Sequence, residues 1–539
     1  MSFTSLLPWR RSALALALAL LAAPAPTVLA QSAQRLPALG DSASDDVDIL
    51  QERRLGDNIM RDLRKDPDYL EDLLLQEYLD DLLGPLLAAA RERDAIDADL
   101  ARRFAWEGFL VRDRAVNAFA LPGGYLGVYL GLIAITATRD ELASVLAHEL
   151  THVTQRHIAR SIGQNSRQSM ATMAGMLLGV LAAAKSRSPD GLQAVIVGSQ
   201  AIAAQGQLNF SRDMEREADR IGLDLMGAAG FGLGGMSAMF EKLDAASRLN
   251  DAGLYPYLRS HPLTSERITE ARLRAEGLTR GPAAGQARHA LMQARARALS
   301  DPGEASLRRV QAAGALGSPA ADLARQAQLY GAALASSRLR DFTLADQQAA
   351  AGLSLVADSQ PDAPVLRRLW RLLRLEILLA RASGDAPSAD LAARLHQASD
   401  ALGTDASRAA LLLRAQTAQT LARLGEPGAD TGLRASTEAL QAWVVEHRRD
   451  APAWDALAAS AQPLGQQVRA LGALAEARWA RGDVTGAVDR FRAAQQAARG
   501  TGAQGYQDAA IIESRLREAE AERRRLWIEQ HGERVPDPG

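Results

Sequence analysis

Residues 138–163 read TRDELASVLAHELTHVTQRHIARSIG, and this stretch decides the fold. Thr138 followed by Glu141 forms a capping box, which marks the start of a helix. Leucine and valine side chains then recur at helical spacing, and Gly163 is the expected stop. The segment HELTH, residues 148–152, therefore lies in the middle of an amphipathic helix.

Two histidines in this segment have the spacing of metal ligands. His148 and His152 are four residues apart, so at about 100° per residue they differ by only about 40° around the helix axis. One helix face thus offers two imidazoles to a single ion. Glu149 lies beside the first ligand, where its carboxylate can accept a proton from the attacking water. The alternative is a pair of histidines on a solvated helix face.

A catalytic zinc site needs three protein ligands and one open position. A metzincin would place Gly at position 155 and His at position 158, but the chain has Gln155 and Ile158, so that class is excluded. His157 points about 140° away from His152 on a continuous helix, so we expect it to be an ordinary polar helix residue.

The third ligand is expected on a later helix, residues 211–222. Glu215 and Asp219 share one face of that helix by the same spacing of four. We assign Glu215 as the third zinc ligand and Asp219 as the acceptor that fixes the tautomer of a ligand imidazole. Two alternatives stay open: Glu217 as the ligand, or an exposed helix with Glu–Arg pairs.

The composition excludes several other kinds of protein. The chain has 539 residues, enough for two to four domains, and it contains no cysteine. Disulfide scaffolds, thiol nucleophiles and cysteine-based metal sites are therefore excluded. The net charge of −2 implies no broad basic surface, so no nucleic-acid partner is expected. Abundant Ala, Leu and Arg favour helix over sheet.

Residues 1–30 have the pattern of a secretory signal peptide. Two arginines precede an apolar run at residues 12–23, and residues 28–30, VLA, place small side chains at a cleavage site. We expect cleavage after Ala30 and a periplasmic location. An uncleaved anchor is the alternative, although a dozen helical residues reach about 18 Å, short of the ~30 Å hydrocarbon core. Gln31 instead of Cys excludes a lipoprotein anchor.

The remainder divides into segments of different composition. We expect a loose polar lead-in at residues 31–65, a domain with mixed helical and β-like signals at 66–280, a helical domain at 285–530 and a tail at 531–539. The helical domain has the spacing of degenerate tetratricopeptide-like (TPR-like) hairpins, with the best match at residues 471–494. Such solenoids offer a concave surface to partner chains, and an unrelated helical bundle is the alternative.

Two further segments have their own patterns. Residues 117–129, NAFALPGGYLGVY, predict two short strands around a Pro-Gly-Gly turn. The insertion at residues 164–210 contains an apolar stretch from Met170 to Ala184. That stretch predicts a buried helix, with a lid over the cleft or a surface that contacts the outer membrane as alternatives.

Taken together, these motifs carry a family resemblance. HELTH, the segment from Glu215 to Asp219 and the stretch SHPL at residues 260–263 resemble the HtpX-like branch of zinc metallopeptidases, peptidase family forty-eight of the metallo clans. The resemblance implies a gluzincin metallopeptidase domain, one Zn²⁺ per chain and endopeptidase activity. It also implies the ligands His148, His152 and Glu215. The predicted fold is thus mainly α with a small β element, followed by an α-helical TPR-like solenoid.

The resemblance also gives roles to residues outside the metal motif. It makes the hairpin the edge of the cleft, where substrate adds as a strand, and a purely structural hairpin is the alternative. The residues of this edge are Asn117, Ala118, Phe119, Ala120, Leu121, Pro122, Gly123 and Gly124. His261 has three interpretations: it stabilises the oxyanion, it occupies the open zinc position in an inhibited resting state, or it only precedes a helix. Arg267 either binds the oxyanion or pairs with Glu266 or Glu270.

Two functions follow as expectations. The first is an exported zinc endopeptidase that degrades misfolded or stalled outer-membrane proteins and aids their assembly, with the repeats bound to those proteins or to the β-barrel assembly machinery. The second is a repeat scaffold or chaperone whose peptidase site is latent or vestigial. Zinc content and cleavage of an unfolded β-barrel substrate distinguish the two.

Overall fold

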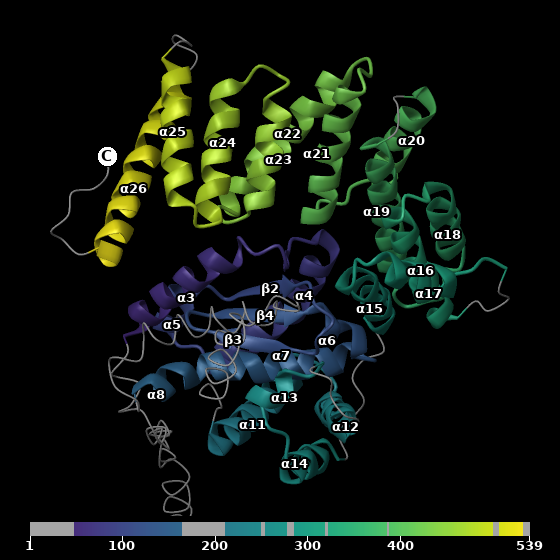
Figure 1. Ribbon diagram of the computed structural model, residues 1–539, viewed down its shortest axis with the longest axis vertical. Coiled ribbons are helices and arrows are strands. Elements are labelled where there is room, and N and C mark those ends of the chain that lie inside the picture. The colour runs from purple at the N-terminus through teal and green to yellow at the C-terminus, as the bar shows by residue number, and fades with distance from the viewer. Residues whose placement is uncertain are drawn as a thin grey trace, which may run out of the picture.

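A computed structural model describes residues 48–163, 211–248, 254–276, 285–317, 322–384, 388–499 and 506–531. Figure 1 shows a body built around a small sheet, with an arc of paired helices above it. The predicted class, mainly α with a small β element, is confirmed. The expected signal peptide and the insertion at 164–210 lie outside the described residues.

In the described part of the chain, the sheet has four strands in the order β1-β2-β4-β3. Strands β2 and β4 are parallel, and the two outer pairs are antiparallel. Strands β3 and β4 form the hairpin that the sequence predicts around the Pro-Gly-Gly turn, and β3 is an edge strand of the sheet. The strands are β1 Tyr69–Leu70, β2 Glu107–Val111, β3 Ala118–Leu121 and β4 Tyr125–Tyr129.

Helices cover this sheet and carry the predicted metal motif. Helix α7 packs on β3 and β4 and contacts α11 and α12, while α4 packs on β2. The helices of this body are α3 Ile49–Leu63, α4 Leu73–Glu92, α5 Ala98–Arg103, α6 Leu130–Ile135, α7 Arg139–Thr154, α8 His157–Gly163, α11 Arg212–Ala228, α12 Gly234–Arg248, α13 Tyr257–Ser260 and α14 Ser265–Ala275.

The predicted loose lead-in at residues 31–65 is wrong for residues 49–63, which form α3. Charged side chains cover one face of this helix, while Ile59 and Met60 on the other are completely buried. These two side chains share a small core with Phe109 and Tyr125 of the sheet. Burial of that apolar face explains why a segment of polar composition is helical.

The C-terminal domain consists of antiparallel helices that contact their sequence neighbours. The best predicted repeat, residues 471–494, forms the α24–α25 hairpin, in which Phe491 is fully buried and Asp483 caps the second helix. The helices are α15 Gln286–Ser300, α16 Glu304–Ala313, α17 Leu323–Arg338, α18 Phe342–Ser354, α19 Ala363–Ala382, α20 Ala389–Asp400, α21 Arg408–Arg423, α22 Ala429–Glu446, α23 Ala451–Ala461, α24 Gln467–Ala480, α25 Val484–Ala498 and α26 Tyr506–His531.

Helices α3 and α4 lie between the sheet and the arc of helices (Figure 1). Helix α4 contacts both α15 and α21, so it joins the two parts of the molecule. Arg295 of α15 is buried there and donates to both oxygens of Asp72, at 2.8 Å each, and to both oxygens of Glu376 on α19. This closed charge cluster fixes α15 and α19 against the start of α4.

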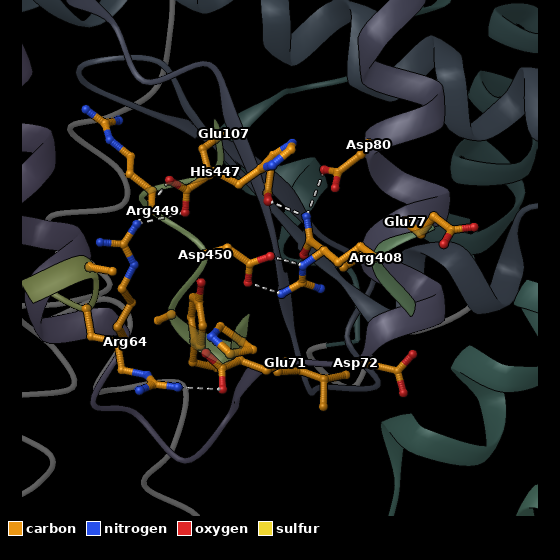
Figure 2. Close-up of a pocket in the computed structure, with 18 of the residues that line it drawn as sticks. Arg64, Glu71, Asp72, Glu77, Asp80, Glu107, Arg408, His447, Arg449 and Asp450 are labelled. Carbon is orange, nitrogen blue, oxygen red and sulfur yellow. Dashed lines mark hydrogen bonds and ion pairs between the residues drawn. The ribbon is translucent and has the colours of Figure 1, made fainter. Parts of the chain in front are cut away.

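A cavity of about 740 Å³ opens between α4, β1 and β2 on one side and the helices α21 to α24 on the other. Figure 2 shows that charged side chains line it, many of them in pairs. Arg64 lies 2.8 Å from Glu107, and Arg408 lies 2.7 Å from Asp450. Arg368 of α19 crosses the boundary to Glu77 of α4, at 2.6 Å. The cavity wall thus adds ion pairs to the boundary between the two parts.

Within the part of the chain that the structure describes, none of the helices combines the length and the apolar character needed to cross a membrane.

Candidate metal centre

Helix α7 begins as the sequence predicts. The hydroxyl of Thr138 accepts a hydrogen bond from the backbone N–H of Glu141, and the side chains of Leu146 and Leu150 are completely buried. The apolar face of α7 therefore anchors the helix in the core, and HELTH occupies its last two turns.

The expected continuation of this helix to Gly163 is wrong. Helix α7 ends at Thr154, and Arg156 adopts a left-handed backbone conformation with φ of 50° before α8 begins at His157. The guanidinium of Arg156 donates to the buried carboxylate of Glu52 on α3, at 3.0 Å. This turn changes the direction of the chain, so the helical-wheel angle between His152 and His157 no longer applies.

Helix α11 places Glu215 and Asp219 beside α7. Ser211 caps the helix, and Gly222 lies against the backbone of α7, where an added Cβ would be 3.2 Å from the carbonyl carbon of Ala147 and from the backbone nitrogen of His148. The missing side chain at Gly222 therefore permits the close approach of the two helices. As a result, the acidic face of α11 meets the histidine face of α7.

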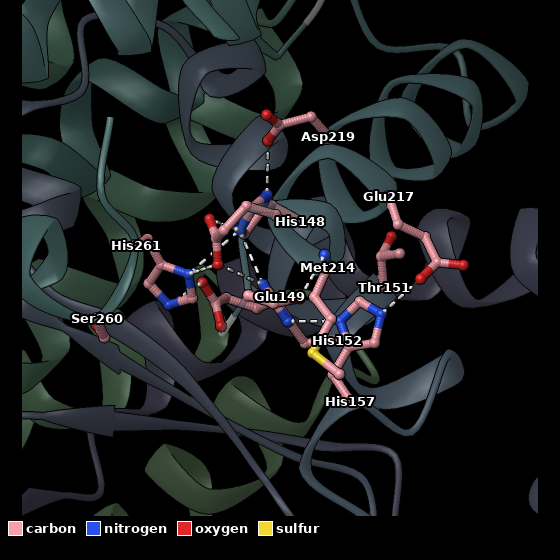
Figure 3. A network of polar contacts seen from close by, with 12 residues as sticks. His148, Glu149, Thr151, His152, His157, Met214, Glu217, Asp219, Ser260 and His261 are labelled. Atoms are coloured by element: carbon pink, nitrogen blue, oxygen red, sulfur yellow. Dashed lines mark hydrogen bonds and ion pairs between the residues drawn. The ribbon is translucent and has the colours of Figure 1, made fainter. Parts of the chain in front are cut away.

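Four side chains converge at this contact: His148, His152, Glu215 and His261. Figure 3 shows the three histidines of this group close together. The Nε2 atoms of His148 and His152 are 3.0 Å apart, and each lies 3.5 Å from one oxygen of Glu215. Nδ1 of His261 lies 3.0 Å from Oε1 of Glu215 and 3.3 Å from Nε2 of His148. All four side chains are at most 2% exposed.

This donor set fits a zinc ion. Ligand atoms about 2.0–2.1 Å from one ion in tetrahedral geometry lie about 3.3 Å apart, close to the separations seen here. Imidazole nitrogen and carboxylate oxygen are zinc ligands. Glu149 is 1% exposed, and neither of its oxygens makes a hydrogen bond within the described residues, although Nε2 of His261 lies 3.4 Å from Oε1. A buried carboxylate in this state calls for a polar partner.

The electrostatics of the cluster agree with this fit. Burial lowers the pKa of His148, but hydrogen bonds to Asp219 and Glu215 outweigh it and raise the pKa to about 10. Burial and the neighbouring His148 and His261 hold the pKa of His152 well below its usual value. Burial raises the pKa of Glu215, yet His261 and His148 lower it more. The carboxylates of Glu215 and Asp219 thus favour positive charge at His148, and a bound divalent cation would also supply positive charge there.

Asp219 and Arg267 form a second layer around the ligands. Oδ1 of Asp219 lies 2.9 Å from Nδ1 of His148, on the side of the ring away from Glu215. Arg267 makes neither of the ion pairs that the sequence suggests. Its guanidinium contacts Asp219 at 2.6 and 2.8 Å and Glu215 at 2.8 Å, and it also donates to the carbonyl of Pro262. Its carboxylate partners therefore lie on α11 and not on its own helix, α14.

The expectation that His157 is an ordinary polar residue is also wrong. It is completely buried, and its Nδ1 lies 2.8 Å from Nδ1 of His152. Its Nε2 lies 3.0 Å from Oε2 of Glu217, which also accepts from Arg160. Glu217 is therefore outside the group of four possible ligands, and its pKa is lowered to about 2, chiefly by the hydrogen bond from His157. The sequence signal for this contact is the position of His157 five residues after His152. That spacing brings the two rings together only because the chain turns at Arg156.

His261 follows the short helix α13 and is held by an aromatic neighbour. Its ring stacks on Tyr257 with centroids 4.6 Å apart, and its backbone N–H bonds to the carbonyl of Tyr257. The following helix, α14, begins at Ser265, as expected. Of the three interpretations of His261, the location of its ring among the ligand atoms favours occupation of the fourth zinc position.

Residues 85–275 match the model of peptidase family M48. This chain carries an M48 peptidase domain. The matched segment contains α7, α11 and His261, so every residue of the cluster lies within the M48 domain.

Several curated proteins are similar to part of this chain. A Vibrio cholerae relative is 39% identical over 256 residues, which cover 47% of this chain and 50% of the relative. The beta-barrel assembly-enhancing protease of Escherichia coli is 34% identical over 246 residues, 46% of this chain and 48% of that protein. The mitochondrial metalloendopeptidase OMA1 of Schizosaccharomyces pombe is 36% identical over 163 residues, 30% and 44% of the two chains. These alignments span about half the length of the bacterial relatives.

Proposed function

We propose that this protein is an exported zinc endopeptidase that acts on outer-membrane proteins during their assembly and quality control. The observation that carries this proposal is the convergence of His148, His152 and Glu215 beside the buried, unbonded carboxylate of Glu149. The M48 match and the relatives named beta-barrel assembly-enhancing protease support it.

In this proposal the Nε2 atoms of His148 and His152 and a carboxylate oxygen of Glu215 hold the zinc ion. When bound, zinc supplies Lewis-acid chemistry that makes water nucleophilic near neutral pH and polarises the scissile carbonyl. Asp219 accepts from Nδ1–H of His148 and so keeps Nε2 of that ring free for the metal. Arg267 neutralises the excess negative charge of Asp219 and Glu215.

Glu149 acts as the general base. Its carboxylate accepts a proton from the attacking water and returns it to the leaving amine. Once the ring of His261 has moved away, no hydrogen bond from the described residues competes for this carboxylate. The result is hydrolysis of a peptide bond without a covalent intermediate.

His261 acts as a regulatory residue in this proposal. Its Nδ1 lies among the ligand atoms, and its Nε2 lies 3.4 Å from Glu149. In this position the ring excludes water from the place where the reaction requires it. In this proposal, activity requires that the segment after α13 moves, and the arrangement with His261 among the ligand atoms is a resting state.

The edge strand β3 is the proposed substrate site. Phe119 and Ala120 are half-buried, and among the described residues β3 pairs with β4 on one side and with no strand on the other. An extended polypeptide can add to the other side through backbone hydrogen bonds, which accept many sequences. The residues of this edge are Asn117, Ala118, Phe119, Ala120, Leu121, Pro122, Gly123 and Gly124.

The C-terminal helices are proposed to bind unfolded outer-membrane proteins or the β-barrel assembly machinery in the periplasm.

Zinc content and proteolysis of an unfolded β-barrel protein test the proposal together. We expect Glu149→Gln to retain about one zinc per chain and to lose cleavage, whereas His148→Ala loses the metal as well. His396→Ala is the matched control, because this exposed histidine of α20 lies outside the metal cluster. Cleavage by Glu149→Gln at the wild-type rate would overturn the assignment. Cleavage that is absent even from a zinc-loaded His261→Ala variant would favour the latent scaffold instead.

A further inference from the structure

The two histidines on α7 are supported in different ways. Nδ1 of His148 meets a carboxylate directly, at 2.9 Å. Nδ1 of His152 meets a second imidazole instead, that of His157, at 2.8 Å. The far nitrogen of His157 then meets Glu217 at 3.0 Å, and Arg160 donates to the same oxygen of Glu217. Figure 3 shows this line of side chains extending from His152 to Glu217.

The positions of the atoms determine which nitrogen carries each proton. Nε2 of His152 faces His148 and Glu215, so a bound metal takes this nitrogen, and the proton must be on Nδ1. Nδ1 of His157 is then the acceptor. A neutral His157 consequently carries its proton on Nε2, where the carboxylate of Glu217 accepts it. Each donor in the chain thus meets one acceptor.

Burial makes this arrangement specific. His152 and His157 are both completely buried, so water cannot replace either hydrogen bond. The turn at Arg156 directs His157 back toward His152, and Glu52 on α3 holds that turn. Glu217 arrives from α11, the helix that also supplies the ligand Glu215. This relay of hydrogen bonds, from His152 through His157 to Glu217, therefore connects α7, α8 and α11 around one ligand.

We propose that His157 and Glu217 are positioning residues that hold His152 in the orientation and tautomer that bind zinc. This inference rests on the proposed zinc site and adds a second support to it. Outer-shell partners of this kind change metal affinity by about 10–100-fold. The carboxylate of Glu217 acts through the intervening imidazole, so its effect is the smaller of the two.

Zinc affinity of the purified full-length protein, measured by competition with a chromophoric chelator, tests the relay without reference to proteolysis. His157→Phe keeps the ring but removes the acceptor, and we expect zinc to bind about 10–100-fold more weakly. His157→Asn offers an amide oxygen in place of Nδ1, and we expect it to restore affinity to within about threefold of the wild type. Ile158→Val is the matched control, since Ile158 is buried on the same helix outside the cluster.

Glu217 provides an independent pair of variants, because its side chain is 23% exposed and tolerates substitution more readily. Glu217→Gln keeps an acceptor for His157 and should bind zinc nearly as the wild type does, whereas Glu217→Leu should bind it several-fold more weakly. Wild-type affinity in both His157→Phe and Glu217→Leu would overturn the relay and leave the zinc site intact. A wild-type protein that binds no zinc would overturn the proposed function itself.

Discussion

Two buried charge clusters in this molecule differ in how completely their charged groups pair with one another. In the cluster of Arg295, Asp72 and Glu376, one guanidinium donates to both oxygens of each carboxylate, at 2.8–2.9 Å. In the metal centre, ring nitrogens of His148 and His152 face each other at 3.0 Å, and Glu149 has no hydrogen-bond partner within the described residues. The first cluster is complete without a ligand, and the second is not.

This difference distinguishes charges that are buried to stabilise the fold from charges that are buried to bind a ligand. A closed ion cluster stabilises one arrangement of helices, and removal of a member leaves buried charges uncompensated. An open cluster is costly for the metal-free protein, so its persistence indicates a ligand. Substitutions in the two clusters should therefore affect different properties: metal content in one and stability in the other.

The largest expected effect is on the open cluster. Glu215→Ala should weaken zinc binding more than about 1000-fold, because it removes a ligand rather than an outer-shell partner, whose loss alone costs about 10–100-fold. His261→Ala should retain about one zinc per chain. Metal analysis after gel filtration checks both variants. Loss of zinc from His261→Ala and not from Glu215→Ala would reverse the ligand assignment.

The closed cluster should respond through stability. Arg295→Met leaves Asp72 and Glu376 buried without their partner, and we expect a loss of about 3–5 kcal/mol in the free energy of unfolding. The urea midpoint measured by circular dichroism checks this. Arg272→Met is the control, since its pair with Glu241 is half-exposed and contributes about 0–1 kcal/mol. Equal midpoints for the two variants would contradict the structural role of the closed cluster.

The predictability of the two clusters from sequence differs for a physical reason. HELTH and the pair Glu215 and Asp219 are local patterns, because a spacing of four on a helix places side chains on one face. The family resemblance implied that side chains from these two helices bind the same zinc ion. The contacts of Arg295 cross 223 positions to Asp72 and 81 to Glu376, and nothing in the local pattern around Arg295 distinguishes it from the many other arginines of the helical domain.

The same reasoning accounts for the errors at the site. A continuous helix would turn His157 away from His152, but Arg156 takes a left-handed conformation that helical periodicity does not reveal. One of the two interpretations of Arg267 pairs it with a glutamate of its own helix, whereas its partners, Asp219 and Glu215, lie on α11. Both errors concern contacts set by the tertiary path of the chain. The predicted hairpin and the start of α7 depend on neighbouring residues, and both are confirmed.

A buried histidine at the boundary between the two parts should make stability depend on pH. His289 of α15 lies 2.6 Å from the hydroxyl of Tyr78 and bonds to the carbonyl of Thr136, and burial lowers its pKa to about 4. The unfolded chain takes up the proton near pH 6.5, so stability is complete above that pH and falls as the pH drops toward 4. The loss should be about 2–3 kcal/mol.

Urea unfolding at several pH values checks this window. His289→Gln cannot become charged and should lack this part of the decline, whereas His396→Gln, at an exposed position of α20, should retain it. If the wild type and His289→Gln decline in parallel between pH 6.5 and 4, the buried histidine does not cause the dependence.

The smallest expected effect concerns the helix contact that creates the open cluster. Gly222→Ala places a methyl group 3.2 Å from backbone atoms of Ala147 and His148, so α11 must shift by a few tenths of an ångström. We expect a loss of about 1–2 kcal/mol in stability and a several-fold decrease in zinc affinity, because Glu215 and Asp219 move with the helix. Gly234→Ala is the matched control, since an added Cβ there meets no atom within 4 Å. If both variants bind zinc equally well, the close approach at Gly222 serves packing alone, and the positions of the ligands tolerate more movement than the short distances in the cluster suggest.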